Sequence, residues 1–362
     1  MASSAVTEAP VRRRERLDPS VFRLAVERIR EGYYSDVYFN RTVDVLRSDQ
    51  QHPHVLMQVF QKKRAIIGGM DEAIAIVKLC SEDFSQLRVH ALYDGDEIAP
   101  WETAMTIEGD YSLFARLETV YLGVLSRRTK VATNVRRVVE AAQGKQIIFF
   151  PARHDHHLVQ TGDGYAAHVS GAIGVSTDAQ ASWWGGKGMG TVPHSLIAAY
   201  QGDTVLAAQK YAEYVDPSAN LVVLVDWEND CARTSLEVAR ALGDRLWGVR
   251  LDTSETMVDA SIQKLMGDFD PRGVNPQLCT LVRRALDREG FENVKIVASG
   301  GFNVEKIERF EHEQVPVDAY GVGSAFFQGV YDFTADVVMV EGRPCAKSGR
   351  RYRPNPRLEL VS

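Results

Sequence analysis

Five short apolar runs, each followed at once by polar or glycine residues, constrain the fold of this chain more than any other feature. The runs are Ile147–Phe150, Leu221–Val225, Leu246–Leu251, Val294–Ala298 and Val317–Val322. Helical patterns such as 234–242 and 275–288 lie between them, and strands that alternate with helices are typical of a parallel α/β sheet. Because ligands bind at the carboxyl ends of parallel strands, we predict an α/β barrel with one site where these runs end.

The order of the other patterns divides the chain into parts. Strand patterns at 55–60 and 86–92 and a helix pattern at 71–79 indicate a small α+β domain before the barrel. An arginine-rich stretch near the N-terminus is typical of a solvated tail, or of an oligomer contact. We therefore predict a mobile arm at 1–18, an N-terminal domain at 19–111, the barrel at 112–333 and a C-terminal segment at 334–362 that packs on the N-terminal domain.

Composition narrows the class of protein. The formal net charge of −6 gives no reason to expect a nucleic-acid partner. No long apolar span occurs and the first ten residues have no apolar signal core, so we expect no membrane association and a cytoplasmic protein. The cysteines Cys80, Cys231, Cys279 and Cys345 form no CxxC pair, which indicates neither a disulfide framework nor a compact zinc site.

Glycines follow the last two apolar runs. Gly300-Gly301 and Gly321-x-Gly323 come after successive predicted strands, so bare backbone N–H groups there could surround one phosphate. Either pair alone could also be an ordinary tight turn. Arg153, after the first run, is a candidate phosphate ligand. Its neighbours His154–His157 lack the spacing of a metal site, since consecutive residues on an extended segment point in opposite directions.

Charged residues follow the second and third runs. In Arg250-x-Asp252-x-Ser254, alternate side chains share one face; an arginine fork suits a carboxylate or phosphate, and an aspartate can accept from ribose hydroxyls or hold Mg²⁺ through water. An internal ion pair between Arg250 and Asp252 is an equally good interpretation. The group that begins with Asp226 and ends at Asp230 suits a magnesium diphosphate, or the cap of the next helix.

A glycine-rich segment runs from Gly185 to Gly190 and ends in His194 before an apolar helix. It lacks the GxxxxGK[ST] order, so a P-loop is excluded on spacing. A helix N-terminus beside His194 could help this side chain receive a phosphoryl group; a histidine that caps the helix is the alternative.

Taken in order, these motifs resemble the type II phosphoribosyltransferases, and specifically the short form of nicotinate phosphoribosyltransferase. The resemblance runs from about Tyr34 to Gln328. Its motifs include Ser35-Asp36-Val37-Tyr38, Gly95-Asp96-Glu97-Ile98 through Ile107-Glu108-Gly109, Leu117-Glu118-Thr119 through Ala132-Thr133, Phe150-x-x-Arg153, Gly190-Thr191-Val192-Pro193-His194-Ser195, Val249-Arg250-Leu251-Asp252-Thr253-Ser254, Ser299-Gly300-Gly301 and Gly321-Val322-Gly323. The resemblance implies an irregular TIM-like α/β barrel beside an open-faced α/β sandwich built from the N- and C-terminal segments.

The resemblance also implies roles for single residues. Phe150 would stack on one face of the pyridine ring and Tyr38 of a second subunit on the other, which implies a homodimer. Arg153 would bind phosphate, Arg250 the pyridine carboxylate, Asp252 the ribose and Asp226 the diphosphate. The 5′-phosphate would lie on Gly300, Gly301, Gly321 and Gly323, with Ser254 and Ser299 as further substrate contacts. His194 would be the residue that ATP phosphorylates.

The implied reaction transfers the phosphoribosyl group of phosphoribosyl diphosphate to nicotinate in NAD biosynthesis, coupled to ATP hydrolysis. An oxocarbenium-like transition state needs charge stabilisation and positioning more than proton transfer, and Mg²⁺ neutralises the departing diphosphate. Some short relatives carry a four-cysteine zinc module near the C-terminus; this chain has only Cys345 there, so we expect no zinc.

One departure from the family pattern leaves other activities open. Asp178 falls near the position where nicotinamide-specific relatives carry an aspartate, and a carboxylate there would repel nicotinate. Nicotinamide phosphoribosyltransferase is therefore one alternative, although the chain is short for it. A quinolinate enzyme would need more cations, and a noncatalytic sensor of phosphoribosyl compounds would have no reason to keep Arg153, Arg250, Asp252 and His194 together. A sugar-phosphate aldolase barrel would need a lysine that none of the strand ends supplies.

Overall fold

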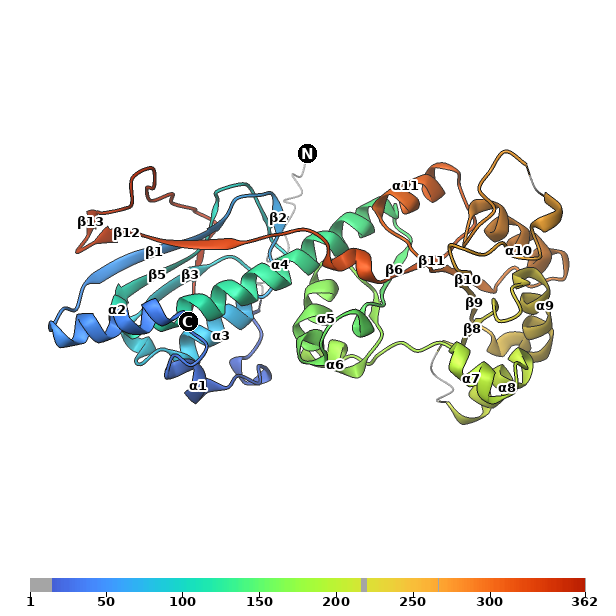
Figure 1. The fold of residues 1–362 in the computed structure, drawn as a ribbon, viewed down its shortest axis with the longest axis horizontal. Helices are drawn as coiled ribbons and strands as arrows, with labels where there is room; N and C mark the ends of the chain where they lie inside the picture. Colours follow the sequence, from blue (N-terminus) through green and yellow to red (C-terminus); the bar gives the residue numbers. More distant parts are fainter. Residues whose placement is uncertain (1–14, 216–219, 266, 362) are drawn as a thin grey trace, which may run out of the picture.

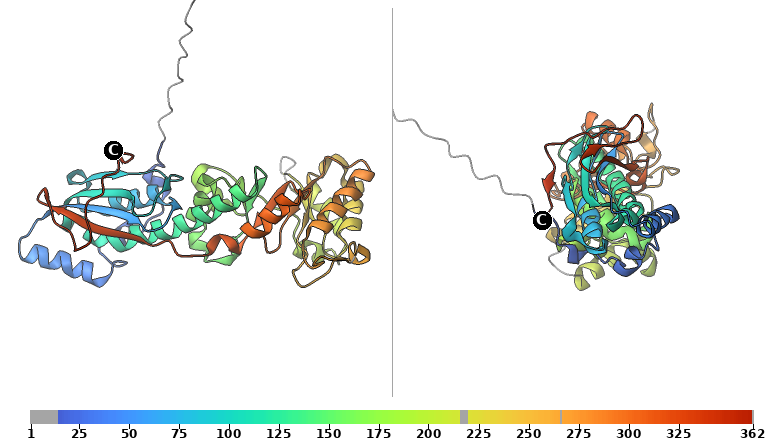
Figure 2. Two further views of the ribbon diagram at one scale, coloured as in Figure 1. Left: turned by 90° about the horizontal axis from the view of Figure 1, so that it is seen from above. Right: turned by 90° about the vertical axis from the view of Figure 1, so that its left-hand side faces the viewer.

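The computed structural model describes residues 15–215, 220–265 and 267–361, and within them two sheets form two lobes of an elongated molecule (Figures 1 and 2). The first lobe contains an antiparallel sheet in the order β13-β12-β1-β5-β3-β14. Its strands are β1 (His54–Gln61), β3 (Arg88–Ala91), β5 (Thr103–Asp110), β12 (Phe333–Val340), β13 (Arg343–Pro344) and β14 (Glu359–Leu360). A two-stranded ribbon of β2 (Ala65–Ile66) and β4 (Glu97–Ile98) lies beside it. Because β12 pairs with β1, the end of the chain returns to the first lobe.

Helices complete the first lobe. These are α1 (Val26–Arg30), α2 (Val37–Ser48) and α3 (Met70–Cys80). The strand patterns at 55–60 and 86–92 and the helix pattern at 71–79 are confirmed by β1, β3 and α3. Of the arm predicted at 1–18, residues 1–14 lie outside the described residues. Arg16 donates to Asp71 Oδ1 at 2.9 Å and to the Leu92 carbonyl at 3.0 Å, so this residue is held against the lobe.

The second lobe is built on a parallel sheet in the order β7-β6-β11-β10-β9-β8. Its strands are β6 (Gln146–Phe149), β7 (Gly174–Val175), β8 (Val222–Leu224), β9 (Gly248–Leu251), β10 (Lys295–Ala298) and β11 (Ala319–Val322). Each of the five apolar runs therefore contains a strand, which confirms the α/β class. The sheet curves as a half-barrel whose edges are β7 and β8, and a parallel bridge from Val192 to Val223 carries the chain alongside β8.

Helices alternate with these strands, as the sequence predicted. They are α5 (Gln160–Val169), α6 (Asp178–Ala181), α7 (His194–Ala199), α8 (Thr204–Tyr214), α9 (Cys231–Leu242), α10 (Pro276–Arg288) and α11 (Val304–His312). Strand residues such as Val249 and Ile296 are fully buried because these helices cover the sheet, which explains the nearly continuous apolar runs. No helix of the described residues is long and apolar enough to cross a membrane.

One long helix joins the two lobes. Helix α4 (Glu118–Ala141) has 24 residues and runs from one lobe into the other (Figure 1). Its first half contributes Tyr121 and Leu125 to the core of the first lobe, and its second half contributes Val131 and Val135 to the core of the second. Two separate cores thus share one helix, which fixes the first lobe relative to the strand ends of the second.

Candidate active site

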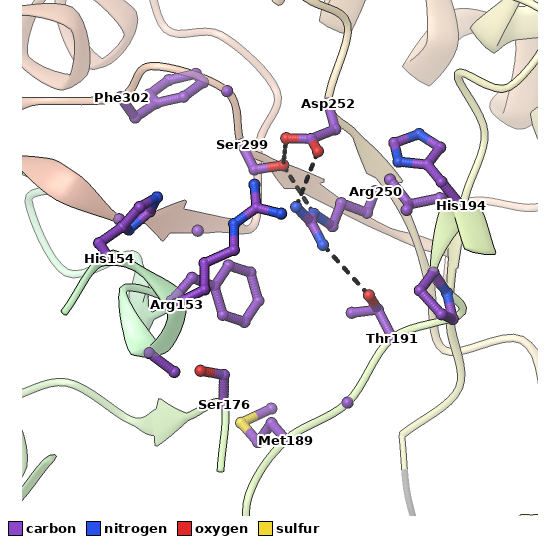
Figure 3. A pocket seen from close by; sticks show the side chains of 18 of the residues that line it. Arg153, His154, Ser176, Met189, Thr191, His194, Arg250, Asp252, Ser299 and Phe302 are labelled. Atoms are coloured by element: carbon purple, nitrogen blue, oxygen red, sulfur yellow. Dashed lines mark hydrogen bonds and ion pairs between the residues drawn. The ribbon is translucent and has the colours of Figure 1, made fainter. Parts of the chain in front are cut away.

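A cavity of about 770 Å³ opens where the parallel strands end at their carboxyl termini (Figure 3). Ten of the residues singled out from the sequence line it. They are Phe150, Arg153, His194, Arg250, Asp252, Ser299, Gly300, Gly301, Gly321 and Gly323. The structure therefore brings residues from four strand ends and from the start of α7 to one place, as expected for a parallel α/β fold.

Arg250, on β9, is held in one orientation by three side chains. Its Nε donates to Ser299 Oγ at 2.8 Å, its Nη2 to Asp252 Oδ2 at 3.1 Å and its Nη1 to Thr191 Oγ1 at 3.3 Å. Ser299 Oγ in turn donates to Asp252 Oδ1 at 2.7 Å. The internal ion pair that the sequence left open is present, yet both members line the cavity. The pair is therefore a preset cation and acceptor rather than a purely structural contact.

The aromatic ring of Phe150 lies under this cation. The guanidinium carbon of Arg250 is 5.0 Å from the centre of the Phe150 ring. One edge of the ring lies close to the backbone at Gly321, since a Cβ added there would come within 2.5 Å of Phe150 Cε2. Only glycine at position 321 lets the ring lie here. The site thus offers a flat apolar surface beside a fixed positive charge.

Arg153 differs from Arg250 because its charge is uncommitted. Within the described residues it has no hydrogen bond or ion pair to the protein, and it points into the cavity from the short turn after β6 (Figure 3). His154 lines the same wall, and a Cβ at Gly323 would lie 2.8 Å from its Cε1. A free guanidinium in a cavity is available for an anionic ligand.

Backbone donors at the glycine turns are also available. Gly300 and Gly301 have φ values of +88° and +65°, and no protein group in the described ranges accepts from their N–H groups or from that of Gly323. Successive backbone N–H groups in a glycine turn can form a concave site that suits an anion.

His194 is the first residue of α7 and is paired with Asp226. Its Nε2 lies 2.9 Å from Asp226 Oδ1, which leaves the lone pair of the ring on Nδ1 when the carboxylate accepts. Burial raises the pKa of Asp226; the nearby His194 opposes this rise and Asp252 adds to it. The N-cap of α7 is Pro193, so the interpretation of His194 as a helix cap is wrong. The cap interpretation does hold for Asp230, which accepts from Arg233 N at the start of α9.

Four of the expected site residues lie outside the cavity lining. Asp178 Oδ1 accepts from the Gly188 N–H at 2.8 Å and thereby holds the 186–190 loop; its contact with the pyridine stays a prediction. Ser254 Oγ is 3.0 Å from Thr256 Oγ1, and Asp226 lies behind His194. Tyr38 is 59% exposed on α2 of the first lobe, with its hydroxyl donating to Asp36 at 3.3 Å.

Two tryptophans precede the glycine-rich segment and have defined surroundings. Trp184 stacks on His168 with ring centres 4.3 Å apart, and Trp183 packs edge-on against Phe22 at 4.8 Å, so the tryptophan pair anchors the loop that leads to the cavity. Within the parts of the chain that the structure describes, no group of three His, Cys, Asp or Glu is arranged to hold a metal ion.

Comparison with known proteins identifies the family. The model of the quinolinate phosphoribosyl transferase N-terminal domain matches residues 36–129. The crystal structure of nicotinate-nucleotide pyrophosphorylase from Pyrococcus furiosus is 32% identical, covers 94% of this chain and 85% of its own, and superposes with a TM-score of 0.78. The chain belongs to the type II phosphoribosyltransferases. The resemblance inferred from the ordered motifs is thus confirmed.

Several relatives are named as nicotinate phosphoribosyltransferases. A nicotinate phosphoribosyltransferase of Mycobacterium tuberculosis is 28% identical over 280 residues, which cover 74% of this chain and 57% of that protein. A nicotinate phosphoribosyltransferase of Bacillus subtilis is 23% identical and is covered to 56%. The chain therefore spans a little over half the length of these relatives. Human nicotinic acid phosphoribosyltransferase, at 18% identity and a TM-score of 0.66, shares the fold.

Several lining residues of this type II phosphoribosyltransferase were given no role in the site from the sequence. They are Ala152, His154, Ser176, Thr177, Met189, Gly190, Thr191, Pro193, Ser195, Leu224, Phe302 and Ser324. Those at 189–195 belong to the segment that crosses the open side of the half-barrel. The glycine-rich pattern marked this segment as a loop, but only the bridge from Val192 to Val223 shows that it forms a wall of the cavity.

Proposed function

We propose that this protein transfers the phosphoribosyl group of phosphoribosyl diphosphate to nicotinate, releasing diphosphate and nicotinate mononucleotide. The observation that carries the proposal is the preset Arg250 beside the Phe150 ring, next to glycine N–H groups that have no protein acceptor. A flat aromatic carboxylate fits the ring and the cation, and a phosphate fits the glycine turns.

The residues present suit a reaction that develops positive charge at C1 of the ribose. Asp252 is fixed by Arg250 and Ser299, so its carboxylate can accept from ribose hydroxyls without rearranging. The nucleophile is the pyridine nitrogen, whose lone pair needs no base. The structure's contribution is therefore to orient the base on Phe150 and to hold the sugar phosphate against the turns.

Mg²⁺ would supply charge neutralisation for the departing diphosphate. The chain offers the carboxylates of Asp226 and Asp252, whose mutual repulsion contributes to the raised pKa of Asp226. Two carboxylates that repel each other suit a divalent cation such as Mg²⁺, which binds one or two protein carboxylates together with substrate phosphates. We propose these two residues, directly or through water, as the protein contacts of the magnesium diphosphate.

ATP coupling through His194 is part of the same proposal. The contact with Asp226 fixes the imidazole and favours the tautomer with the free lone pair on Nδ1, which can attack the terminal phosphorus of ATP. The phosphoryl group would then be transferred from His194 to water during turnover, so that ATP hydrolysis accompanies phosphoribosyl transfer. The partial exposure of the His194 side chain, 44%, leaves it reachable by a nucleotide.

A homodimer completes the proposal. Tyr38 lies in the first lobe, beside the exposed side chains of Tyr34 and Val37. An exposed aromatic patch of this kind suits a protein interface. We propose that Tyr38 of one subunit stacks on the pyridine bound at Phe150 of the other.

The decisive experiment measures diphosphate release from phosphoribosyl diphosphate and Mg²⁺ with nicotinate, nicotinamide or quinolinate, each with and without ATP. Release with nicotinate that ATP accelerates would support the proposal. A preference for nicotinamide would contradict the placement of Asp178 away from the cavity. A preference for quinolinate would assign Arg153 to the second carboxylate, and release with none of the three would favour a phosphoribosyl-compound sensor.

A further inference from the structure

A lysine stands behind the Gly300–Gly301 turn. Lys306 Nζ donates to the Gly300 carbonyl at 3.0 Å and lies 4.3 Å from the centre of the Phe302 ring. Its own backbone N–H donates to the Asn303 side chain at 2.9 Å, which caps α11. Lys306 does not line the cavity, whereas Gly300, Gly301 and Phe302 do. The ammonium group is therefore tied to the rear of the turn.

The hydrogen bond from Lys306 to the Gly300 carbonyl fixes the direction of the next backbone donor, the N–H of Gly301. The C=O and N–H of one trans peptide point in opposite directions. Because the Gly300 carbonyl points to Lys306, the N–H of Gly301 in the same peptide points away from Lys306 and toward the cavity side. Glycine at φ +88° and +65° could rotate this peptide at little cost, so a contact that holds it has a specific effect on the donor.

A carboxylate lies against the same turn. A Cβ added at Gly301 would overlap Glu255 Oε1, so the side chain of Glu255 covers that glycine directly. Glu255 is exposed and makes no hydrogen bond or ion pair within the described ranges, although its charge acts on Lys306. Burial lowers the pKa of Lys306, and Glu255 opposes this. A negative group thus stands next to donors that suit an anion.

We propose that Lys306 and Glu255 set the affinity of the Gly300–Gly301 turn for the 5′-phosphate in opposite directions. Lys306 is a positioning residue that orients the Gly301 N–H and adds positive charge. Glu255 repels the bound phosphate and thereby favours its release. This inference rests on the proposed function, since it takes the sugar phosphate to bind at this turn.

The test compares steady-state kinetics of the full-length protein and its variants with phosphoribosyl diphosphate as the varied substrate. K306M should raise the KM for phosphoribosyl diphosphate by about tenfold, the effect of losing one charge-assisted contact, with a smaller change in kcat. K306R should recover most of the loss because a guanidinium can also donate to the Gly300 carbonyl. E255Q should lower the same KM by about threefold to tenfold. The KM for nicotinate should stay unchanged in all three.

Matched controls separate a local effect from a general one. E308Q removes an exposed carboxylate two residues after Lys306 on the same helix, and K347M removes an exposed lysine in the other lobe. Neither should change the KM for phosphoribosyl diphosphate by as much as twofold, because exposed charges are screened by solvent and salt and act weakly on the site.

Several results would overturn the inference. One is a K306M variant that loses kcat or stability with no change in this KM, which is the behaviour of a merely structural lysine. Another is an E255Q variant whose KM for phosphoribosyl diphosphate is unchanged or raised. Because this variant replaces only one carboxylate oxygen of an exposed side chain, it still tests the inference if K306M does not fold. If the wild-type protein transfers phosphoribosyl groups normally while both variants match it, the inference fails and the proposed function stands.

If the wild-type protein shows no transfer with any base, the proposed function fails instead. Calorimetric binding of ribose 5-phosphate to the wild-type protein and to E255Q then tests the turn by itself. Tighter binding by E255Q would support the opposing role of Glu255. Equal binding would refute it.

Discussion

Glu118, the first residue of α4, is a half-buried carboxylate among other negative charges of the first lobe. Burial, together with the negative charges of Asp336 and Asp36, raises the pKa of Glu118 from its usual 4.5 to about 7. No cation is among the causes of this shift. The substitution Glu118→Gln keeps the shape and the polarity of the side chain and removes its ability to ionise.

The magnitude follows from the shift. In the folded protein the pKa of Glu118 is above its unfolded value, so the folded state binds more protons between pH 4.5 and about 7. The contribution of Glu118 to the unfolding free energy is therefore fully present below pH 4.5 and is lost as the pH rises through about 7. A shift of about 2.5 pK units corresponds to about 3 kcal/mol, and the partial exposure of the side chain reduces this to about 2 kcal/mol.

The assay is urea unfolding of the wild-type protein and the variant at pH 5 and pH 8, at one fixed protein concentration. Glu118→Gln should gain about 2 kcal/mol of unfolding free energy relative to the wild-type protein on going from pH 5 to pH 8. Glu292→Gln, at an exposed position, is the matched control and should show no such gain. If the unfolding free energies of the wild-type protein and Glu118→Gln differ by the same amount at both pH values, burial does not penalise the Glu118 carboxylate and this expectation is wrong.

Three further substitutions test the site. His194→Ala should abolish the acceleration by ATP while slow uncoupled diphosphate release remains, and unchanged coupling in a side-by-side ATPase assay would remove His194 from this role. Arg250→Ala should raise the KM for nicotinate by about tenfold to a hundredfold, the effect of losing a charged hydrogen bond; a normal KM would take Arg250 out of the base pocket. Asp178→Asn should leave the preference for nicotinate over nicotinamide unchanged because the carboxylate accepts from Gly188 and does not line the cavity, and a reversed preference measured with the two bases would contradict that placement.

The parallel sheet and the position of the cavity could be predicted from the sequence because both depend on local pattern. A strand covered on both faces must be apolar throughout, so runs such as Ile147–Phe150 are recognisable without knowing their neighbours. Polar residues placed directly after such runs come together because all parallel strands end on the same side. Arg153, Arg250 and the glycines of the turns were found in this way, and each lines the cavity.

The pairing of distant segments could not be predicted in the same way. Strand β12 joins β1 across more than half of the chain, with Gln58 opposite Asp336, and nothing local in 333–340 specifies that partner. The segment at 189–195 is a similar case. Its glycines mark a loop, but its place along β8 depends on one parallel bridge at Val192. Long-range register is set by the sum of tertiary contacts, which local propensity does not contain.

The direction of a side chain at the end of an element is the other part that a pattern leaves open. Asp178 stands one residue after Thr177, which caps α6 together with Gln180, and that cap turns the Asp178 carboxylate toward the Gly188 N–H. At Arg250 the sequence left two interpretations open, an internal ion pair and a ligand contact. The structure makes them compatible. Asp252 occupies one edge of the guanidinium and leaves its face toward the ring of Phe150. A cation that its protein contacts already hold in one orientation needs little reorganisation to receive a second anion, and that preset geometry is the physical reason to assign the base to this side of the cavity.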